Sequence, residues 1–342
     1  MVYSFELIKH ANIRYRESLP PLAVCELFTM LFSLGIPAEI TLETLGNALF
    51  LTFECRTLTE DEISWLSGHS AVVFMAEKHN GLLKPLTFPS SAYLPDDLPE
   101  ILKYKGKTSV TFTRMMINTA LALSPFRGNA QPLTFFDPLC GRGTGCFCAL
   151  TAGMNAVGLD LDRRDVKEAS DYFSRYLKYH KLKHEVKTRS ETVASRSVPI
   201  VSFRFAAEKE RYFSGDVRTL TLAAADTAES PALFRREKAH ILAADLPYGV
   251  QHAPQSGVKP ESLQRFLSRA LTAWKQTLLP GGVLAVSYNT LTLPTDLIRN
   301  ALLTAGFRLP RSECFGSLRH EVEQAVVRDV LFALNTEEES VI

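Results

Sequence analysis

Two segments of the chain join a carboxylate to backbone features that suit ligand binding, and both follow apolar runs. The segment 137–145 opens with Asp137 and carries three glycines, so its backbone can approach a bound molecule where side chains would clash. The segment 245–248 opens with Asp245, whose carboxylate can accept hydrogen bonds from an amino group. These residue types favour binding of a nucleotide-like molecule beside an amine that is to be activated.

The glycine segment is expected to follow a strand and to open a helix, as nucleotide-binding turns do. Gly141 and Gly143 match the first half of the dinucleotide pattern, but Cys146 stands where its third glycine is expected. A nucleotide without a pyrophosphate therefore fits better, and S-adenosylmethionine is the common one. No Gly-Lys-Ser/Thr follows, so the segment is not a standard phosphate loop. The alternative is a tight strand–helix turn that holds no ligand.

Carboxylates farther along the chain are candidates for the rest of such a cofactor. Asp160 ends the next expected strand, where a carboxylate can accept both hydroxyls of a ribose. Asp216 is expected to follow a short strand over 211–213 and to reach the adenine amino group, and Asp226 is a weaker candidate for that role. We predict a cofactor site formed by these residues: Asp137, Leu139, Cys140, Gly141, Gly143, Thr144, Asp160, Leu161 and Asp216.

The second segment reads Asp245-Leu246-Pro247-Tyr248 and suits an exocyclic amine, which is a poor nucleophile because its lone pair is delocalised into the ring. The Asp245 carboxylate and the Leu246 carbonyl can accept its two N–H bonds and aim the lone pair. Pro247 stiffens the turn, and Tyr248 offers a flat face for a base taken out of its stack. The alternative is a proline-containing turn with a half-buried aromatic residue.

Other candidates are assigned weaker or structural roles. Cys146 and Cys148 are two apart on an expected helix and point to different sides, so with Cys140 they are interpreted as core thiols and no metal site is predicted. His252 is interpreted as a loop residue that could also assist proton removal. Two small basic groups are interpreted as solvated surface that could meet phosphates; they are Lys103, Lys105 and Lys107, and Arg319 with His320.

The pattern of apolar runs predicts how these segments are positioned. From residue 133 onward strands and helices alternate, which indicates a parallel sheet with helices on both faces. Two β-rich runs within about 183–209 break the alternation and are interpreted as an inserted hairpin. The expected strands are 133–136, 156–159, 211–213, 239–244, 283–286 and 325–334, and the expected helices are 164–181, 264–278 and 296–305.

The first 85 residues are predicted to form a small α/β domain. Strands are expected over 2–8, in two runs within 40–55 around Gly46, and over 71–75, with a helix over 20–35. Thr59 and Glu62 have the spacing of a capping box for a second helix. Four prolines within 85–99 predict a linker over 86–108, so the catalytic domain is expected to span 109–342.

Composition sets broader limits. The 342 residues carry 38 basic and 37 acidic side chains, so the total charge does not by itself indicate a polyanionic partner. No secretory leader or membrane-spanning run is recognised, and the cysteines are scattered. The expected protein is soluble and cytoplasmic.

Taken together, the glycine turn, Asp160, Gly215-Asp216, the segment 245–249 and Gly281-Gly282 resemble the class I S-adenosylmethionine-dependent methyltransferases. Within them the chain is similar to the RNA methylase group that includes the tRNA guanosine-N2 methyltransferases. The resemblance implies a Rossmann-like, mostly parallel seven-stranded sheet with a late antiparallel hairpin over 307–334. It also implies that a helix over 111–120, with Thr113, packs against the methionine end of the cofactor.

The leading functional hypothesis is therefore an RNA methyltransferase acting on guanine N2 in tRNA, with the N-terminal domain holding the RNA. A second hypothesis is a DNA adenine or cytosine amino-methyltransferase. A third is a non-catalytic RNA-binding protein that keeps the cofactor fold, against which the intact Asp245 and Tyr248 argue.

Overall fold

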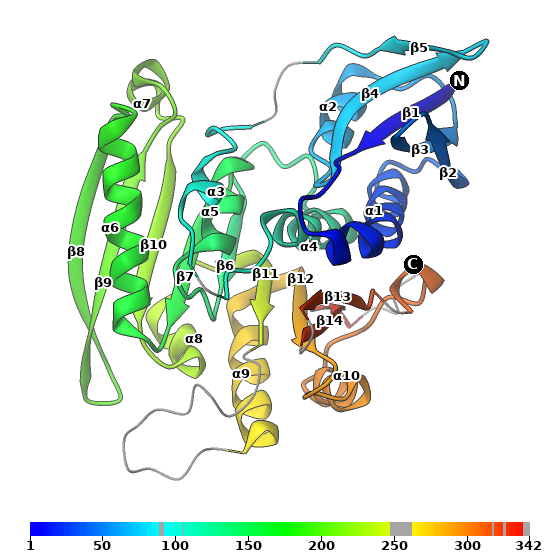
Figure 1. Cartoon of the computed structure of the whole chain (residues 1–342). Coiled ribbons are helices and arrows are strands. Elements are labelled where there is room, and N and C mark those ends of the chain that lie inside the picture. The colour runs from blue at the N-terminus through cyan, green and yellow to red at the C-terminus, as the bar shows by residue number, and fades with distance from the viewer. Residues whose placement is uncertain (89–91, 105, 247–261, 317, 324–325, 338–342) are drawn as a thin grey trace.

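A computed structural model describes the chain except residues 89–91, 105, 247–261, 317, 324–325 and 338–342 (Figure 1). Two sheets organise it, one built from the first 85 residues and one from residues 134 onward. Among the helices so described, none is both long and apolar enough to cross a membrane.

The first sheet is antiparallel and has five strands in the order β2-β3-β1-β4-β5. Its inward face is apolar because alternate residues of β1, including Tyr3 and Phe5, are fully buried under α1 and α2. The elements are β1 (Val2–Leu7), α1 (Ile13–Phe32), β2 (Ile40–Leu45), β3 (Ala48–Glu54), α2 (Glu60–Ser67), β4 (Val72–His79) and β5 (Leu82–Pro85).

The helices α1 and α2, which cover this sheet, each begin directly after a residue whose side chain caps the helix. The capping box predicted for α2 is present, with Thr59 and Glu62 bonded reciprocally. The start of the first helix is wrong in the sequence prediction, because α1 begins at Ile13 rather than at Pro20. The Asn12 side chain accepts hydrogen bonds from the backbone of Arg14 and Tyr15, so the cap lies a full turn or more ahead of the prolines.

A buried polar cluster joins this first unit to the helix α4 (Val110–Leu123). The carboxylate of Glu26 is fully buried in α1 and accepts hydrogen bonds from the backbone and hydroxyl of Ser70 at 2.8 and 2.5 Å. Asn118 of α4 donates to the same carboxylate at 2.8 Å and to Gly68 O at 2.8 Å. Because a buried charge needs such partners, these bonds fix α1 and α4 against each other.

The second sheet has nine strands, of which the inner five are parallel neighbours and the outer four antiparallel. The prediction of a mostly parallel seven-stranded sheet is therefore corrected to a mixed nine-stranded one, since strands are added antiparallel at both edges. The order is β13 (His320–Glu323), β14 (Val326–Leu334), β12 (Leu278–Asn289), β11 (Ala239–Asp245), β6 (Thr134–Asp137), β7 (Asn155–Asp160), β10 (Arg218–Ala224), β9 (Arg196–Phe205) and β8 (His184–Val193).

Alternation along the parallel strands directs their side chains to two separate cores. Phe135 packs on the core of α4, α5 (Thr144–Thr151) and α6 (Arg163–Tyr179), whereas its neighbour Phe136 packs on the opposite core. That second core is covered by the helices α8 (Ser230–Leu233), α9 (Leu263–Thr277) and α10 (Thr295–Thr304). Helices on both faces explain why the parallel strands are apolar throughout.

The structure contradicts one predicted strand and locates the predicted insertion. The aromatic run 211–213 lies in the short helix α7 (Lys209–Ser214), and the strand beside β7 is instead β10. The predicted hairpin near 183–209 corresponds to β8 and β9, which pair with each other and extend the sheet beyond β10. The predicted linker contains α3 (Leu98–Ile101), and Tyr93 and Leu94 in it are buried in the core that α4, α5 and α6 share.

The path of the chain through the sheet identifies one edge as the natural ligand site. From β6 the chain continues to β7 and β10 on one side, and then crosses to β11 and β12 on the other. In open α/β sheets ligands bind outside the carboxyl ends of the strands at such a switch point. We name this the carboxyl edge; it lies toward the lower part of Figure 1, where β7 and β11 end.

A substitution at Gly158 would test how tightly β7 is packed under the glycine turn. A Cβ there would lie 2.7 Å from Leu222 Cδ2, 2.9 Å from Cys146 Sγ and 3.0 Å from Cys140 Sγ. We expect Gly158→Ala to lower the free energy of unfolding by roughly 1–3 kcal/mol, as overpacking does, measured by urea unfolding.

Gly68→Ala is the matched control, because Gly68 is exposed, has φ −73° and would place its Cβ 3.2 Å from a single backbone oxygen. Equal effects of the two substitutions would contradict the close packing assigned to Gly158.

Candidate active site

The glycine turn connects β6 to α5 and is held by backbone hydrogen bonds to the neighbouring strand. Cys140 N donates to Leu159 O at 2.9 Å, and Gly141 N donates to Asp160 Oδ2 at 2.8 Å. Gly141 and Gly143 have φ angles of +48° and +88°, a region that L side chains rarely adopt. The turn therefore needs glycine at these positions, and it presents backbone groups at the carboxyl edge.

Gly145 is required for a different reason, because it gives room to Asp137. A Cβ at Gly145 would collide with Asp137 Oδ2 and lie 3.3 Å from its Cγ. Asp137 is thereby buried at the end of β6, close to the first turn of α5, and its Oδ1 accepts from Leu139 N at 3.2 Å. The glycine spacing and the buried acid are thus parts of one arrangement.

The pKa of Asp137 is raised to about 8, mainly by burial; the neighbouring carboxylates of Asp160 and Asp245 act in the same direction, and the hydrogen bond from Leu139 N acts against it. A cation placed beside this side chain would favour its ionised form. The turn consequently suits a ligand that carries positive charge near β6.

Asp160 ends β7 and is oriented by two backbone donors, Gly141 N at 2.8 Å and Asp162 N at 2.8 Å. Each carboxylate oxygen takes one of these bonds and keeps a further acceptor position. Desolvation raises the pKa of Asp160. The next side chain, Leu161, is 57% exposed although it is apolar, which leaves a hydrophobic surface beside the carboxylate.

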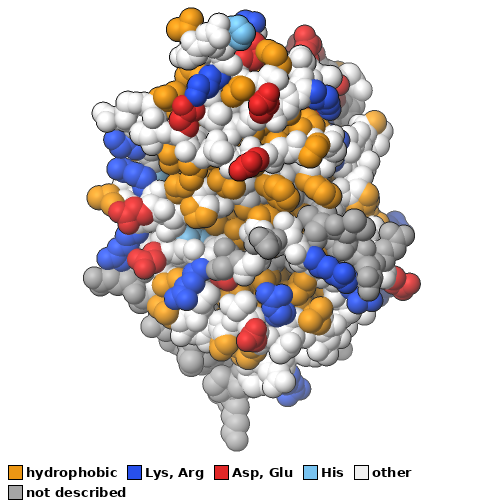
Figure 2. Space-filling view, turned by 90° about the vertical axis from the view of Figure 1, so that its right-hand side faces the viewer, with side chains coloured by type: hydrophobic (Ala, Val, Ile, Leu, Met, Phe, Trp, Pro, Cys, Tyr) orange, Lys and Arg blue, Asp and Glu red, His pale blue; other side chains and the backbone are white. Residues whose placement is uncertain are grey.

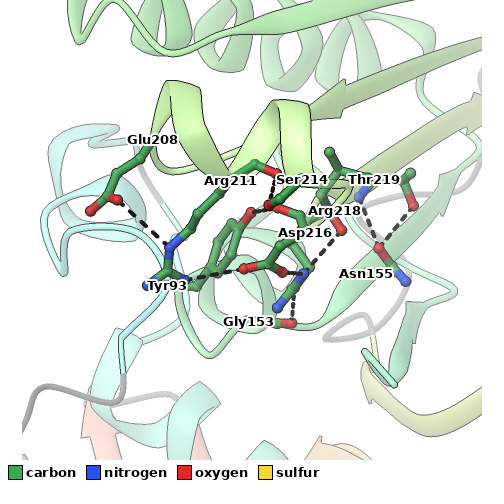
Figure 3. Close-up of polar contacts among 10 residues, drawn as sticks. Tyr93, Gly153, Asn155, Glu208, Arg211, Ser214, Asp216, Arg218 and Thr219 are labelled. Carbon is green, nitrogen blue, oxygen red and sulfur yellow. Dashed lines mark hydrogen bonds and ion pairs between the residues drawn. The ribbon is translucent and has the colours of Figure 1, made fainter. Parts of the chain in front are cut away.

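Asp216 does not belong to this site, and its assignment to the adenine is corrected. It precedes β10 and therefore lies at the amino end of a strand whose other end reaches Asp160. Its carboxylate pairs with Arg218 at 2.6 Å and Arg211 at 3.4 Å, and Tyr93 Oη donates to its carbonyl (Figure 3). These contacts hold α7 and the segment before α3 at the opposite edge of the sheet.

Asp226, the weaker candidate for the adenine contact, lies at the carboxyl edge, where Asp216 was predicted to lie. β10 pairs Ala224 with Asp160, and Ala225 N donates to Asp160 O at 2.9 Å, so Asp226 follows the strand at the carboxyl edge. Its Oδ1 caps the short 3-10 helix Thr227–Glu229, and its Oδ2 lies 3.2 Å from Arg269. The run 219–225 directly before it was the signal for a buried strand, and the aromatic run 211–213 diverted the prediction.

Asp245 lies at the end of β11 and is held by three side chains from separate segments. Its Oδ1 accepts from Ser287 Oγ at 2.6 Å, and its Oδ2 accepts from Thr108 Oγ1 at 2.6 Å. Arg328 of β14 lies 3.0 Å from Oδ2 with its side chain only 4% exposed. Leu246 N donates to Ser287 O at 2.8 Å, so β12 fixes the strand end. Pro247, Tyr248 and His252 lie outside the described residues.

Sequence reasoning missed the residues before α4 that connect the two halves of the site. Tyr104 Oη lies 2.9 Å from Thr144 Oγ1, at the start of α5, and the Arg142 guanidinium stacks 4.9 Å from the Tyr104 ring centre. Four residues later Thr108 reaches Asp245. No pattern in the segment marks these contacts, because they depend on where α3 and α4 bring it.

The other predicted residues have mainly structural surroundings. Thr113 is buried in α4 and its hydroxyl donates to Ser109 O at 3.0 Å. Lys107 donates to Pro99 O at 2.5 Å, so it caps α3 and is not free to meet a phosphate as proposed. His320 is buried against Phe112, and burial lowers its pKa, so its interpretation as solvated surface is wrong.

Comparisons with known proteins give a fold-level likeness. No family model and no curated protein matches the chain. Solved structures similar to it include TrmN from Thermus thermophilus, with TM-score 0.41, 16% identity and cover of 87% of this chain. The chain spans 59% of the length of that protein.

Two further similar structures are an rRNA methyltransferase, aviRa, from Streptomyces viridochromogenes and the magnesium protoporphyrin IX methyltransferase from Synechocystis PCC 6803 with bound SAM. The first has TM-score 0.41 and 15% identity, covering 70% of this chain and 92% of its own. The second has TM-score 0.39 and 15% identity, covering 67% of this chain and 86% of its own. The likeness is one of fold.

The raised pKa of Asp137 predicts a pH dependence of stability. Between about pH 4 and pH 8 the folded protein keeps a proton on Asp137 that the unfolded chain has lost, so the contribution of Asp137 to stability is fully present below pH 4 and is lost toward pH 8. This one group lowers the free energy of unfolding by up to about 1.4 kcal/mol per pH unit. Asp137→Asn should remove that slope, measured by urea unfolding across the window.

Asp171→Asn is the control, because Asp171 is about half exposed and pairs only with the exposed Lys167 on the same helix among its described contacts. Parallel curves for wild type and Asp137→Asn would show that Asp137 is already ionised in the folded protein.

Proposed function

We propose that this chain is an S-adenosylmethionine-dependent methyltransferase that methylates an exocyclic amino group of a nucleic-acid base, with guanine N2 in tRNA as the leading substrate. The observation that carries the proposal is the placement of Asp137, Asp160, Asp226 and Asp245. All four follow parallel strands at the carboxyl edge, on both sides of the switch point.

The residues of the glycine turn fit a nucleoside that carries a cationic amino acid. Asp160, with acceptor positions left on both oxygens, would hold the ribose hydroxyls, and exposed Leu161 would cover one face of the adenine. Asp226 would accept the adenine amino group. Burial raises the pKa of Asp137, so a neighbouring cation would favour ionisation of its carboxyl group. Asp137 would therefore face the methionine end of the cofactor. When bound, S-adenosylmethionine supplies an electrophilic methyl group on a sulfonium sulfur.

Asp245 and the Leu246 carbonyl would accept the two N–H bonds of the target amine. The lone pair of the nitrogen is then directed away from these acceptors, and the proton released after methylation leaves from a nitrogen beside a carboxylate. Ser287, Thr108 and Arg328 hold that carboxylate in one orientation, so little reorganisation is needed when charge develops on the nitrogen. Fixed acceptors of this kind account for rate enhancement through positioning.

We favour RNA over DNA as the substrate because the glycine turn and the segment 245–249 resemble the RNA methylases. In addition, the unit formed by the first 85 residues is fixed to α4 through the hydrogen bond between Asn118 and Glu26. A substrate held by that unit would keep a constant position relative to the site. Amino-methylation of DNA remains the second candidate, because the chemistry assigned to Asp245 is the same for either nucleic acid.

Asp245→Ala should lower the turnover number on the order of 10²–10³-fold, since a preorganised acceptor is lost. The affinity for S-adenosylmethionine, measured by calorimetry, should change by less than about twofold. Asp160→Ala should show the converse, with cofactor affinity reduced about tenfold or more through loss of a charged acceptor.

Asp216→Ala is the matched control, because it removes an aspartate from the opposite edge of the same sheet. Normal turnover of Asp245→Ala, or equal loss in Asp216→Ala, would contradict the assignment of the carboxyl edge as the active site.

Nucleoside mass spectrometry of cells with and without the gene distinguishes the substrates. Loss of N2-methylguanosine from tRNA supports the leading proposal, and loss of a methylated amino base from DNA supports the second. Unchanged nucleosides in both nucleic acids would refute methylation of a base.

A further inference from the structure

A lysine-lined pocket lies at the far end of α6 from the candidate active site. It has a volume of about 370 Å³, is open to solvent, and is formed where α6 ends, β8 begins and α7 starts. Four of its residues are exposed lysines, and the remainder are two leucines and a histidine: Lys178, Lys181, Lys183, Lys209, Leu177, Leu182 and His184. We name it the lysine pocket; α6 and α7 meet at the upper left of Figure 1.

The charges around the lysine pocket are not balanced by its own lining, since no carboxylate is among the residues that line it in the described part of the chain. The neighbouring acid Glu185 accepts a hydrogen bond from Tyr212 Oη at 2.6 Å, which lowers its pKa, and the charges of Lys187, Arg204 and Lys183 act in the same direction. Like charges gathered in one hollow repel each other, so an anion that enters it is favoured.

Helix-end stabilisation explains only part of this arrangement. Lysines near the carboxyl end of α6 complement its dipole, but Lys209 is the first residue of α7, where a cation has no such benefit. Four lysines therefore converge from two helices and the connection to β8.

Lys181 has a left-handed backbone conformation, which is unfavourable for lysine and indicates that its side chain has a role. Leu182 N donates to Leu177 O and Lys181 N to Lys178 O, which is the Schellman arrangement at a helix end. In this motif the residue directly after the C-cap is left-handed and is usually glycine. Here that residue is Lys181, with φ +54°. A strained lysine that lines a cationic pocket is the pattern of a binding residue.

Two exposed aromatic side chains lie close in the chain to residues that line the pocket, although neither is itself among the lining residues. Tyr179 is 82% exposed and follows Lys178, and Phe213 is 70% exposed and lies four residues after Lys209, on the same side of α7. Flat apolar rings in solvent beside cationic side chains are the combination that binds single-stranded nucleic acid, through stacking and phosphate contacts.

We propose that the lysine pocket binds the phosphate backbone of the RNA substrate, with Tyr179 and Phe213 stacking on unpaired bases beside it; this inference rests on the proposed function. The face of the molecule on which α1 and the first sheet lie has a different character. Figure 2 shows hydrophobic side chains gathered across its middle, with acidic and basic side chains mixed around them. That face lacks the single sign of charge that the lysine pocket has.

The length of α6 sets the separation of the pocket from the Asp160 end of the candidate active site. α6 has 17 residues and runs from the end of the Asp160 strand to the pocket, which is about 26 Å at ~1.5 Å per residue. A stacked strand that covers this distance has about eight nucleotides at ~3.4 Å per step.

Fluorescence anisotropy with a labelled oligouridylate of about 20 nucleotides tests the pocket. The variant Lys178→Gln/Lys181→Gln/Lys209→Gln should bind at least tenfold more weakly than wild type at moderate salt. The slope of log affinity against log salt should become less steep by about 2, since each lost contact with a single strand contributes ~0.7. The control removes three exposed lysines outside the pocket: Lys9→Gln, Lys84→Gln and Lys238→Gln.

Lys181→Gly separates binding from stability. Glycine relieves the left-handed strain, so the melting temperature should rise, while RNA affinity should fall. A fall in both, or no change in affinity, would overturn the role assigned to this side chain. Tyr179→Ala with Phe213→Ala should weaken oligouridylate binding at least fivefold and leave binding of inorganic polyphosphate unchanged.

The outcomes distinguish this inference from the proposed function. Lysine-dependent binding of oligouridylate without methylation of any RNA would refute the proposed function and leave the pocket supported. Methylation of RNA with the same affinity in wild type and the triple variant would refute the pocket alone. Equal affinity of wild type for polyphosphate and for oligouridylate of the same charge would also refute it, because bases would then contribute nothing.

Discussion

The ion pair between Asp245 and Arg328 is the interaction on which the carboxyl edge depends. The Asp245 side chain is 24% exposed, whereas the Arg328 side chain, 3.0 Å away, is only 4% exposed. Arg328 is therefore the buried member of the pair, and its charge depends on Asp245 for compensation. Since Thr108 and Ser287 bind the same carboxylate, the segment before α4, the parallel strand β12 and the antiparallel strand β14 are all fixed relative to β11.

Two carboxylates at this edge are placed in opposite surroundings. Asp137 is buried behind Gly145, and its pKa is raised to about 8. Asp245 instead has an arginine and two hydroxyl donors. Environments that differ in this way assign different tasks to the same residue type. In the proposed reaction Asp137 faces a cationic cofactor, and Asp245 faces the amine that receives the methyl group.

The molecule has functional candidates at both edges of one sheet. The carboxyl edge carries the acids, whereas the opposite edge carries the Asp216 ion pairs and, at the end of α6, the lysine pocket. The hairpin of β8 and β9, which extends the sheet beyond β10, supplies Arg204, which stacks over the Tyr212 ring beside the pocket. A long polyanion could contact both edges, and a free nucleoside could contact only one.

The sequence alone determined the alternation of strands and helices, the glycine turn, and the position of Asp137, Asp160 and Asp245 at strand ends. These follow from local patterns, since apolar runs and glycine spacing act over a few residues. Only the tertiary structure decided that Asp226 replaces Asp216, because which end of β10 an acid follows depends on where that strand begins. It also decided that Thr108, Ser287 and Arg328 meet at Asp245. Those residues come from distant segments, and pairing of the buried Arg328 charge with Asp245, rather than any local pattern, brings them together.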